Sequence, residues 1–137
     1  MNNNRTAKKV FICSLVVAGF VLSVVRDANA DFTFGMPVNL GSTINSSAAE
    51  QCPSLSADGL EIYFSDHSPM LRPGGQSRSD LWVATRPTKD DPWGEPENLG
   101  PTVNSTTDDE YPDLSADGLS LYFSSNRGAG GLGSYDL

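Results

Sequence analysis

Residues 53–60 read Pro53-Ser54-Leu55-Ser56-Ala57-Asp58-Gly59-Leu60, and residues 112–119 read Pro112-Asp113-Leu114-Ser115-Ala116-Asp117-Gly118-Leu119. An Asp-Gly pair between apolar runs predicts a hairpin, because glycine accepts a positive φ and the aspartate side chain satisfies nearby backbone donors. The same turn is needed wherever the stretch recurs. The sequence therefore predicts structural turn residues rather than catalytic acids at Asp58, Gly59, Asp117 and Gly118.

The duplication extends well beyond these eight residues. Residues 35–41 (Gly-Met-Pro-Val-Asn-Leu-Gly) return as 94–100 (Gly-Glu-Pro-Glu-Asn-Leu-Gly), and Tyr-Phe-Ser at 63–65 returns at 122–124. Each pair starts 59 residues apart, which marks a true internal repeat. Asp136-Leu137 matches Asp80-Leu81 at a shorter offset, so the second loop is shorter. The repeats are expected at about 35–93 and 94–137, the second being truncated.

Each repeat has the pattern of β structure. Apolar and polar residues alternate over 60–65 and 119–124, which predicts strands paired with 53–56 and 112–115. Residues 80–85 predict a third strand and residues 96–99 a fourth, at an edge because it contains a proline. Residues after 30 show no sustained helical period. The predicted fold class is all-β, and its expected core positions are Leu55, Phe64, Trp82, Leu114 and Phe123.

These residues resemble the WD-like β-propeller repeat of TolB-type periplasmic proteins. The shared pattern is Pro-x-Leu-Ser-x-Asp-Gly, then an apolar strand ending in Phe-Ser, a loop, and Asp-Leu-Trp at 80–82. The resemblance implies β-propeller blades of four antiparallel strands over residues 31–137. Propellers need 4–8 blades, whereas these residues supply about two, an incomplete propeller. The chain is then a fragment, the product of a truncated gene, or a protomer that assembles with further blades.

Residues 1–30 have the parts of a secretory signal peptide. Arg5, Lys8 and Lys9 precede an apolar run over 10–25, and Ala28 and Ala30 suit a signal-peptidase cleavage site. The run is shorter than the ~20 residues of a membrane span. Cleavage would leave no stable membrane span, although an uncleaved anchor is the alternative. We expect a periplasmic or extracellular location.

Charge and residue types restrict the possible chemistry. The net charge is −8, and loss of four basic residues and one acidic residue with residues 1–30 would leave −11, which disfavours nucleic acid as a partner. His67 is the only histidine, so no two-histidine metal site exists, and no Ser-His-Asp arrangement is identifiable. The acidic run 108–110 lacks calcium-loop spacing. We expect no catalytic residues, cofactor or metal. Cys52 is the one cysteine after residue 30, and it is interpreted as a buried strand residue.

Partner binding is the function that these observations favour. Trp93, between the repeats, is a candidate for an exposed contact, although packing is the favoured interpretation, and loop 66–79, rich in Pro, Gly, Ser and Arg, is the candidate partner-specific segment. The TolB resemblance implies interaction with a protein or cell-envelope component, without catalysis. The alternatives are an accessory propeller fragment of a larger secreted hydrolase, glycan-active or peptidase, and a truncated product without function.

Overall fold

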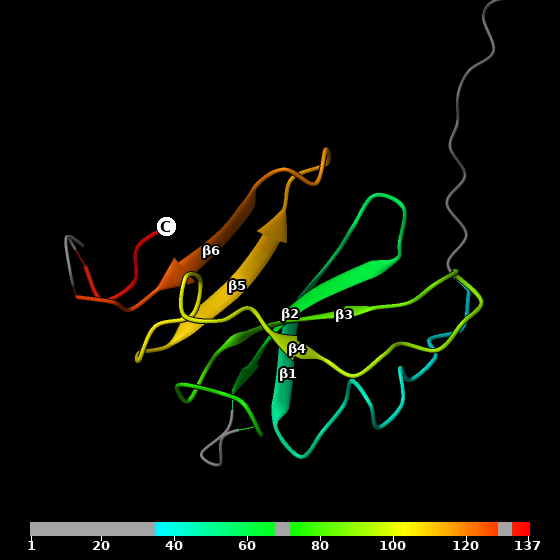
Figure 1. Ribbon diagram of the computed structural model, residues 1–137, viewed down its shortest axis with the longest axis horizontal. Helices are drawn as coiled ribbons and strands as arrows, with labels where there is room; N and C mark the ends of the chain where they lie inside the picture. The colour runs from blue at the N-terminus through cyan, green and yellow to red at the C-terminus, as the bar shows by residue number, and fades with distance from the viewer. Residues whose placement is uncertain (1–34, 68–71, 129–132) are drawn as a thin grey trace, which may run out of the picture. The chain divides into compact units, whose positions relative to one another are not determined.

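The computed structural model describes residues 35–67, 72–128 and 133–137 (Figure 1). Residues 1–37 and 38–137 form separate units, and of the first unit only 35–37 are described, as exposed chain without regular structure. The predicted signal peptide, with Ala28 and Ala30, lies outside the described residues. Across the described ranges all regular structure is β, which confirms the all-β class. These ranges contain no helix long and apolar enough to cross a membrane.

The first sheet has four antiparallel strands in the order β1-β2-β3-β4. They are β1 (Ala49–Leu55), β2 (Glu61–His67), β3 (Leu81–Thr85) and β4 (Glu97–Asn98). Figure 1 shows β4 beside β3 at the edge predicted for residues 96–99. Because β4 belongs to the second sequence repeat, the second repeat completes the sheet of the first.

The second sheet repeats only the hairpin of the first. It contains β5 (Asp109–Leu114) and β6 (Leu121–Ser125), which pair antiparallel. Ser125 also forms an isolated bridge with Asp136, where the sequence places the counterpart of β3. Antiparallel sheets of four and two strands are therefore the observed architecture.

Both hairpins contain the same irregularity in their first strand. The pairing shifts between Gln51 and Ser54 in β1 and between Glu110 and Asp113 in β5. The bulge residues Cys52 and Tyr111 have left-handed backbone conformations, with φ of 52° and 59°. These strands begin earlier than the sequence predicts, because the bulge accommodates the extra residue that breaks strict alternation. Cys52 is half-buried rather than fully buried.

The buried apolar core lies mainly in the first sheet. Phe64 and Trp82 pair across β2 and β3, and each is 2 % exposed. The other members are Ile44, Ile62 and Ala84, with Trp93 packed against them. The expectation that Leu55 belongs to the core was wrong, since Leu55 is 55 % exposed. It is the last residue of the edge strand β1, and no described segment covers it.

Leu114 and Phe123 are half-buried rather than core residues. Their sheet has two strands in the described residues, so Phe123 lacks the cross-strand aromatic partner that Trp82 provides for Phe64. The Leu114 N–H donates to Ser54 Oγ of β1, and the Arg127 guanidinium lies over the Phe123 ring, so both residues are more buried than Leu55.

Candidate functional site

The Asp-Gly turns are held by the same hydrogen bonds in both repeats. The Ser56 hydroxyl donates to Asp58 Oδ1 at 2.6 Å, and the Leu60 N–H donates to the same oxygen at 3.0 Å. The counterparts in the second repeat measure 2.6 Å and 3.1 Å. The Ser56 hydroxyl, followed by the Leu60 N–H, lowers the pKa of Asp58. Gly59 has a φ of 72° and Gly118 of 71°, so each glycine occupies the conformation that its turn requires.

Arg72 links three segments of the first repeat. Its Nη2 donates to the Ile44 carbonyl at 2.9 Å and to Glu50 Oε1 at 2.7 Å. Its guanidinium lies 5.5 Å from the centre of the Phe64 ring, within cation–π range. Burial would raise the pKa of Glu50, but hydrogen bonds from Ser46, with the charge of Arg72, lower it. Arg72 therefore joins loop, edge strand and core.

Arg127 makes the same set of contacts in the second repeat. It donates to the Val103 carbonyl and, at 2.8 Å, to Asp109 Oδ1, and lies 5.4 Å from the centre of the Phe123 ring. The partners of the two arginines are 59 residues apart, whereas Arg72 and Arg127 are 55 apart. The sequence interpretation missed this pair because the loops differ in length. The available signal was an arginine shortly before a Gly-Gly pair in both loops.

The described part of loop 66–79 folds around the carboxylate of Asp80, which is 1 % exposed. Asp80 accepts hydrogen bonds from the Gln76 N–H at 2.5 Å and from the Ser77 hydroxyl at 2.8 Å. Pro73, Gln76 and Arg78 remain exposed. The loop thus has a rigid base and an outward surface able to contact a partner.

Asp66 is a buried carboxylate beneath this loop, 4 % exposed. Its Oδ2 lies 3.4 Å from Arg72 Nε, and its Oδ1 accepts the Asp80 N–H at 3.3 Å. Burial raises the pKa of Asp66, although the Trp82 indole N–H, the Asp80 N–H and Arg72 oppose the rise. The indole N–H faces this carboxylate without a hydrogen bond of normal geometry. The charged form of Asp66 therefore costs folding free energy at neutral pH.

Other predicted site residues take part in contacts between elements. His67 is the last residue of β2, and its Nδ1 is 3.4 Å from Glu110 Oε1. Trp93 packs on the core with the Arg86 guanidinium 4.3 Å from its ring centre, as its packing interpretation predicts. The carboxylates of run 108–110 have separate partners, namely Arg78, Arg127 and His67. In the described part of the chain, no three His, Cys, Asp or Glu side chains group closely enough to hold a metal.

A buried asparagine joins the second repeat to the first. Asn104 Oδ1 accepts the Leu81 N–H at 2.8 Å, and its Nδ2 donates to the Leu81 carbonyl at 2.9 Å. Nδ2 also donates to Asn98 Oδ1 at 2.9 Å. The counterpart in the first repeat, Asn45, keeps only the equivalent side-chain bond, to Asn39 at 3.0 Å. The Asn45 carboxamide therefore has no strand opposite it, among the described residues, that corresponds to the Leu81 strand opposite Asn104.

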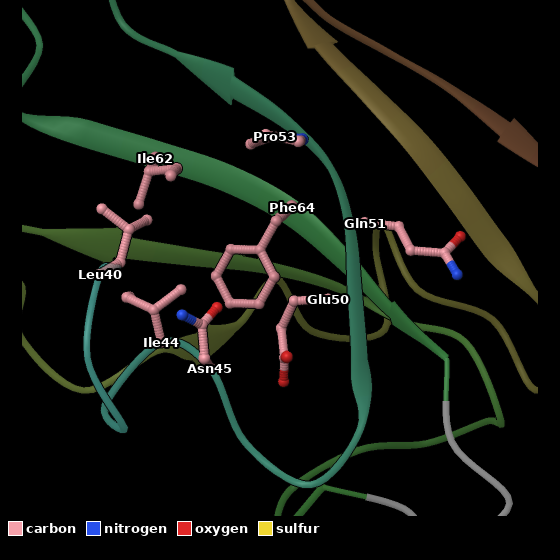
Figure 2. A pocket seen from close by; sticks show the side chains of 8 residues that line it. All are labelled: Leu40, Ile44, Asn45, Glu50, Gln51, Pro53, Ile62 and Phe64. Atoms are coloured by element: carbon pink, nitrogen blue, oxygen red, sulfur yellow. The ribbon is translucent and has the colours of Figure 1, made fainter. Parts of the chain in front are cut away.

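A small pocket opens beside Asn45 on the outer face of the first sheet. Its volume is about 90 Å³, well below the ~300 Å³ of small-molecule sites, so it suits a single side chain. Figure 2 shows the Phe64 ring pointing toward Asn45 and Ile44. The lining residues are Leu40, Ile44, Asn45, Glu50, Gln51, Pro53, Ile62 and Phe64. No protein family, curated protein or solved structure matches the chain.

Proposed function

We propose that this chain is an exported, non-catalytic module of β-propeller-type repeats that binds a protein or a component of the cell envelope. The single observation that carries the proposal is that both repeats build the same unit of hairpin, Asp-Gly turn and an arginine that binds a carbonyl and a carboxylate of its repeat. The four-stranded order of the first sheet, closed by a strand from the next repeat, is what a blade requires.

The carboxylates of the described residues support binding rather than catalysis. Asp58 and Asp117 hold turns, and Asp80 organises its own loop. The buried carboxylates of Asp66 and Asp109 lie beside Arg72 and Arg127. Propeller hydrolases use pairs of carboxylates that flank a substrate, whereas these carboxylates are engaged by neighbouring groups of the same chain.

We place the partner-binding surface on loop 66–79. Its exposed described residues, among them Pro73, Gln76 and Arg78, project from a base fixed by Asp80 and Arg72, so a partner would meet a surface that needs little ordering. The length of this loop also differs between the repeats, as expected of a segment adapted to one ligand.

The test is affinity capture from an envelope extract with the full chain on a solid support. We expect a captured component to be lost at least tenfold with Gln76→Ala/Arg78→Ala and retained with the control Lys89→Ala/Glu95→Ala, which changes exposed residues between the repeats. Equal capture by both variants would place the binding surface elsewhere. Hydrolysis of a glycan or peptide by the purified chain would overturn the non-catalytic assignment.

A further inference from the structure

The contact between the two repeats is a template for a second contact of the same kind. The face of the second hairpin that carries Leu114 lies on the face of the first sheet that carries Ser54 and Tyr63. The Leu114 N–H donates to Ser54 Oγ at 3.0 Å, so the Ser54 face meets β5. Leu114 and Phe123 are half-buried while Tyr122 on the opposite face is exposed, which shows that the Leu114 face is the one turned inward. Asn104 and the His67–Glu110 pair add polar contacts at either side.

The two outer faces of the described unit are the two halves of that same interface. On the first repeat, Leu55 is the counterpart of Leu114, and its face contains the pocket beside Asn45. On the second repeat, Tyr122 is the counterpart of Tyr63. Tyr122 is 59 % exposed, whereas Tyr63 is half-buried beneath the second repeat. Each outer face therefore presents one half. Residues 40–45 lie over Ile62 and Phe64 on the first face, but Leu40 and Leu55 stay exposed there, and Tyr122 stays exposed on the second.

We propose that the Tyr122 face of one copy of this chain binds the pocket face of a second copy, head to tail. This rests on the repeat-module part of the proposed function and names a partner for it, a second copy. The contacts of the template have matching groups in the second interface. The Leu55 N–H would meet the Asp113 carboxylate, because Asp113 is the counterpart of Ser54. An N–H bond to a carboxylate is stronger than one to a hydroxyl.

The remaining template contacts also have counterparts in the second interface. Gln51 and Asn126 replace the Glu110–His67 pair and are both neutral. The main chain of Leu137, the counterpart of Leu81, would enter beside Asn45, whose carboxamide has the atoms that Asn104 uses on Leu81. Leu137 is 98 % exposed in the single chain. Because the two halves differ, the contact is heterologous and builds rings or open chains rather than a two-fold dimer.

The test measures the mass of the purified full chain in solution across a dilution series. We expect association that Tyr122→Glu or Leu55→Glu each weakens at least tenfold, with circular dichroism unchanged because both side chains are exposed. Each variant keeps one intact face, so an equal mixture of the two should form a dimer that contains one of each. The control Leu119→Glu changes an exposed turn residue away from both faces and should leave association unchanged.

A wild-type chain that stays monomeric at every concentration would overturn the proposal. That result is expected if residues 1–34 or an envelope component, and not a second copy, covers these faces. Failure of the mixed variants to pair would also overturn it, because a heterologous contact requires that pairing. The capture variant Gln76→Ala/Arg78→Ala should self-associate normally. Loss of capture and loss of self-association are therefore separate results, and either can fail alone.

Discussion

Replacing Asn104 with leucine should destabilise the fold far more than the same replacement at its counterpart Asn45. The side chain of Asn104 is 1 % exposed and is the hydrogen-bond partner of both main-chain polar groups of Leu81, a residue that is itself fully buried. Leucine has a similar volume but no hydrogen-bonding atoms. In Asn104→Leu, the Leu81 N–H would be left without a partner in a place that water cannot reach, whereas the Leu81 carbonyl would keep its bond from the Leu99 N–H at 3.1 Å.

The size of the effect follows from the three hydrogen bonds of the Asn104 side chain. The Leu81 N–H left without a partner costs about 1–3 kcal/mol, and the lost bonds to the Leu81 carbonyl and to Asn98 cost about 0.5–1.5 kcal/mol each, so Asn104→Leu should lower the free energy of unfolding by about 2–6 kcal/mol. Asn45→Leu removes one side-chain bond to Asn39, which contributes only about 0.5–1.5 kcal/mol. Against a total stability of about 5–15 kcal/mol for a typical domain, the first loss is large and the second tolerable.

Urea unfolding followed by tryptophan fluorescence measures both variants, since Trp82 is buried in the first sheet. The protein should be dilute enough to be monomeric, so that Asn45 is compared without a second copy. Equal losses for Asn104→Leu and Asn45→Leu would refute the reasoning. That result would mean that the bonds to Leu81 do not hold the repeats together.

Three further outcomes follow from the contacts. Arg127→Met removes the ion pair of the buried Asp109 carboxylate, which keeps its hydrogen bonds from Ser105, and should cost about 1.5–3 kcal/mol in urea unfolding; the exposed control Arg78→Met should cost about 0–1 kcal/mol. Burial would raise the pKa of Asp109, but hydrogen bonds lower it overall. The resulting stability is present above about pH 4 and is lost as the pH falls through the lowered pKa, a slope that acid titration should find flattened in Asp109→Asn. The Cβ added in Gly118→Ala would meet no atom within 4 Å. The loss of stability measured by calorimetry should therefore be only the cost of placing alanine in a left-handed backbone conformation, about 1–2 kcal/mol.

Local pattern predicted the strands and turns well. The alternation over residues 60–65 and the Asp-Gly pair at 58–59 specify β2 and its turn through interactions that span only a few residues. The same holds for the hairpin of the second repeat. Such features depend on side-chain alternation and on the φ that glycine allows, both of which are visible in a single sequence.

Burial and the arginine contacts were less predictable. Leu55 occupies a core position in the pattern, yet its exposure depends on whether another segment packs over the edge strand. Arg72 and Arg127 lie in loops of unequal length, so no fixed spacing marks them as counterparts. Their equivalence appears only when the chain brings each to a carbonyl, a carboxylate and an aromatic ring.

The sequence by itself determined the repeat, the β class and the Asp-Gly turns, because these arise from residue identity and short spacings. Only the tertiary structure decided that β4 completes the sheet of the preceding repeat and that Asn104 binds the main chain of Leu81. It also decided which faces stay uncovered among the described residues. These features depend on contacts between distant residues, and a side chain that is exposed in one repeat can be buried in the next when only the second has a neighbour against it.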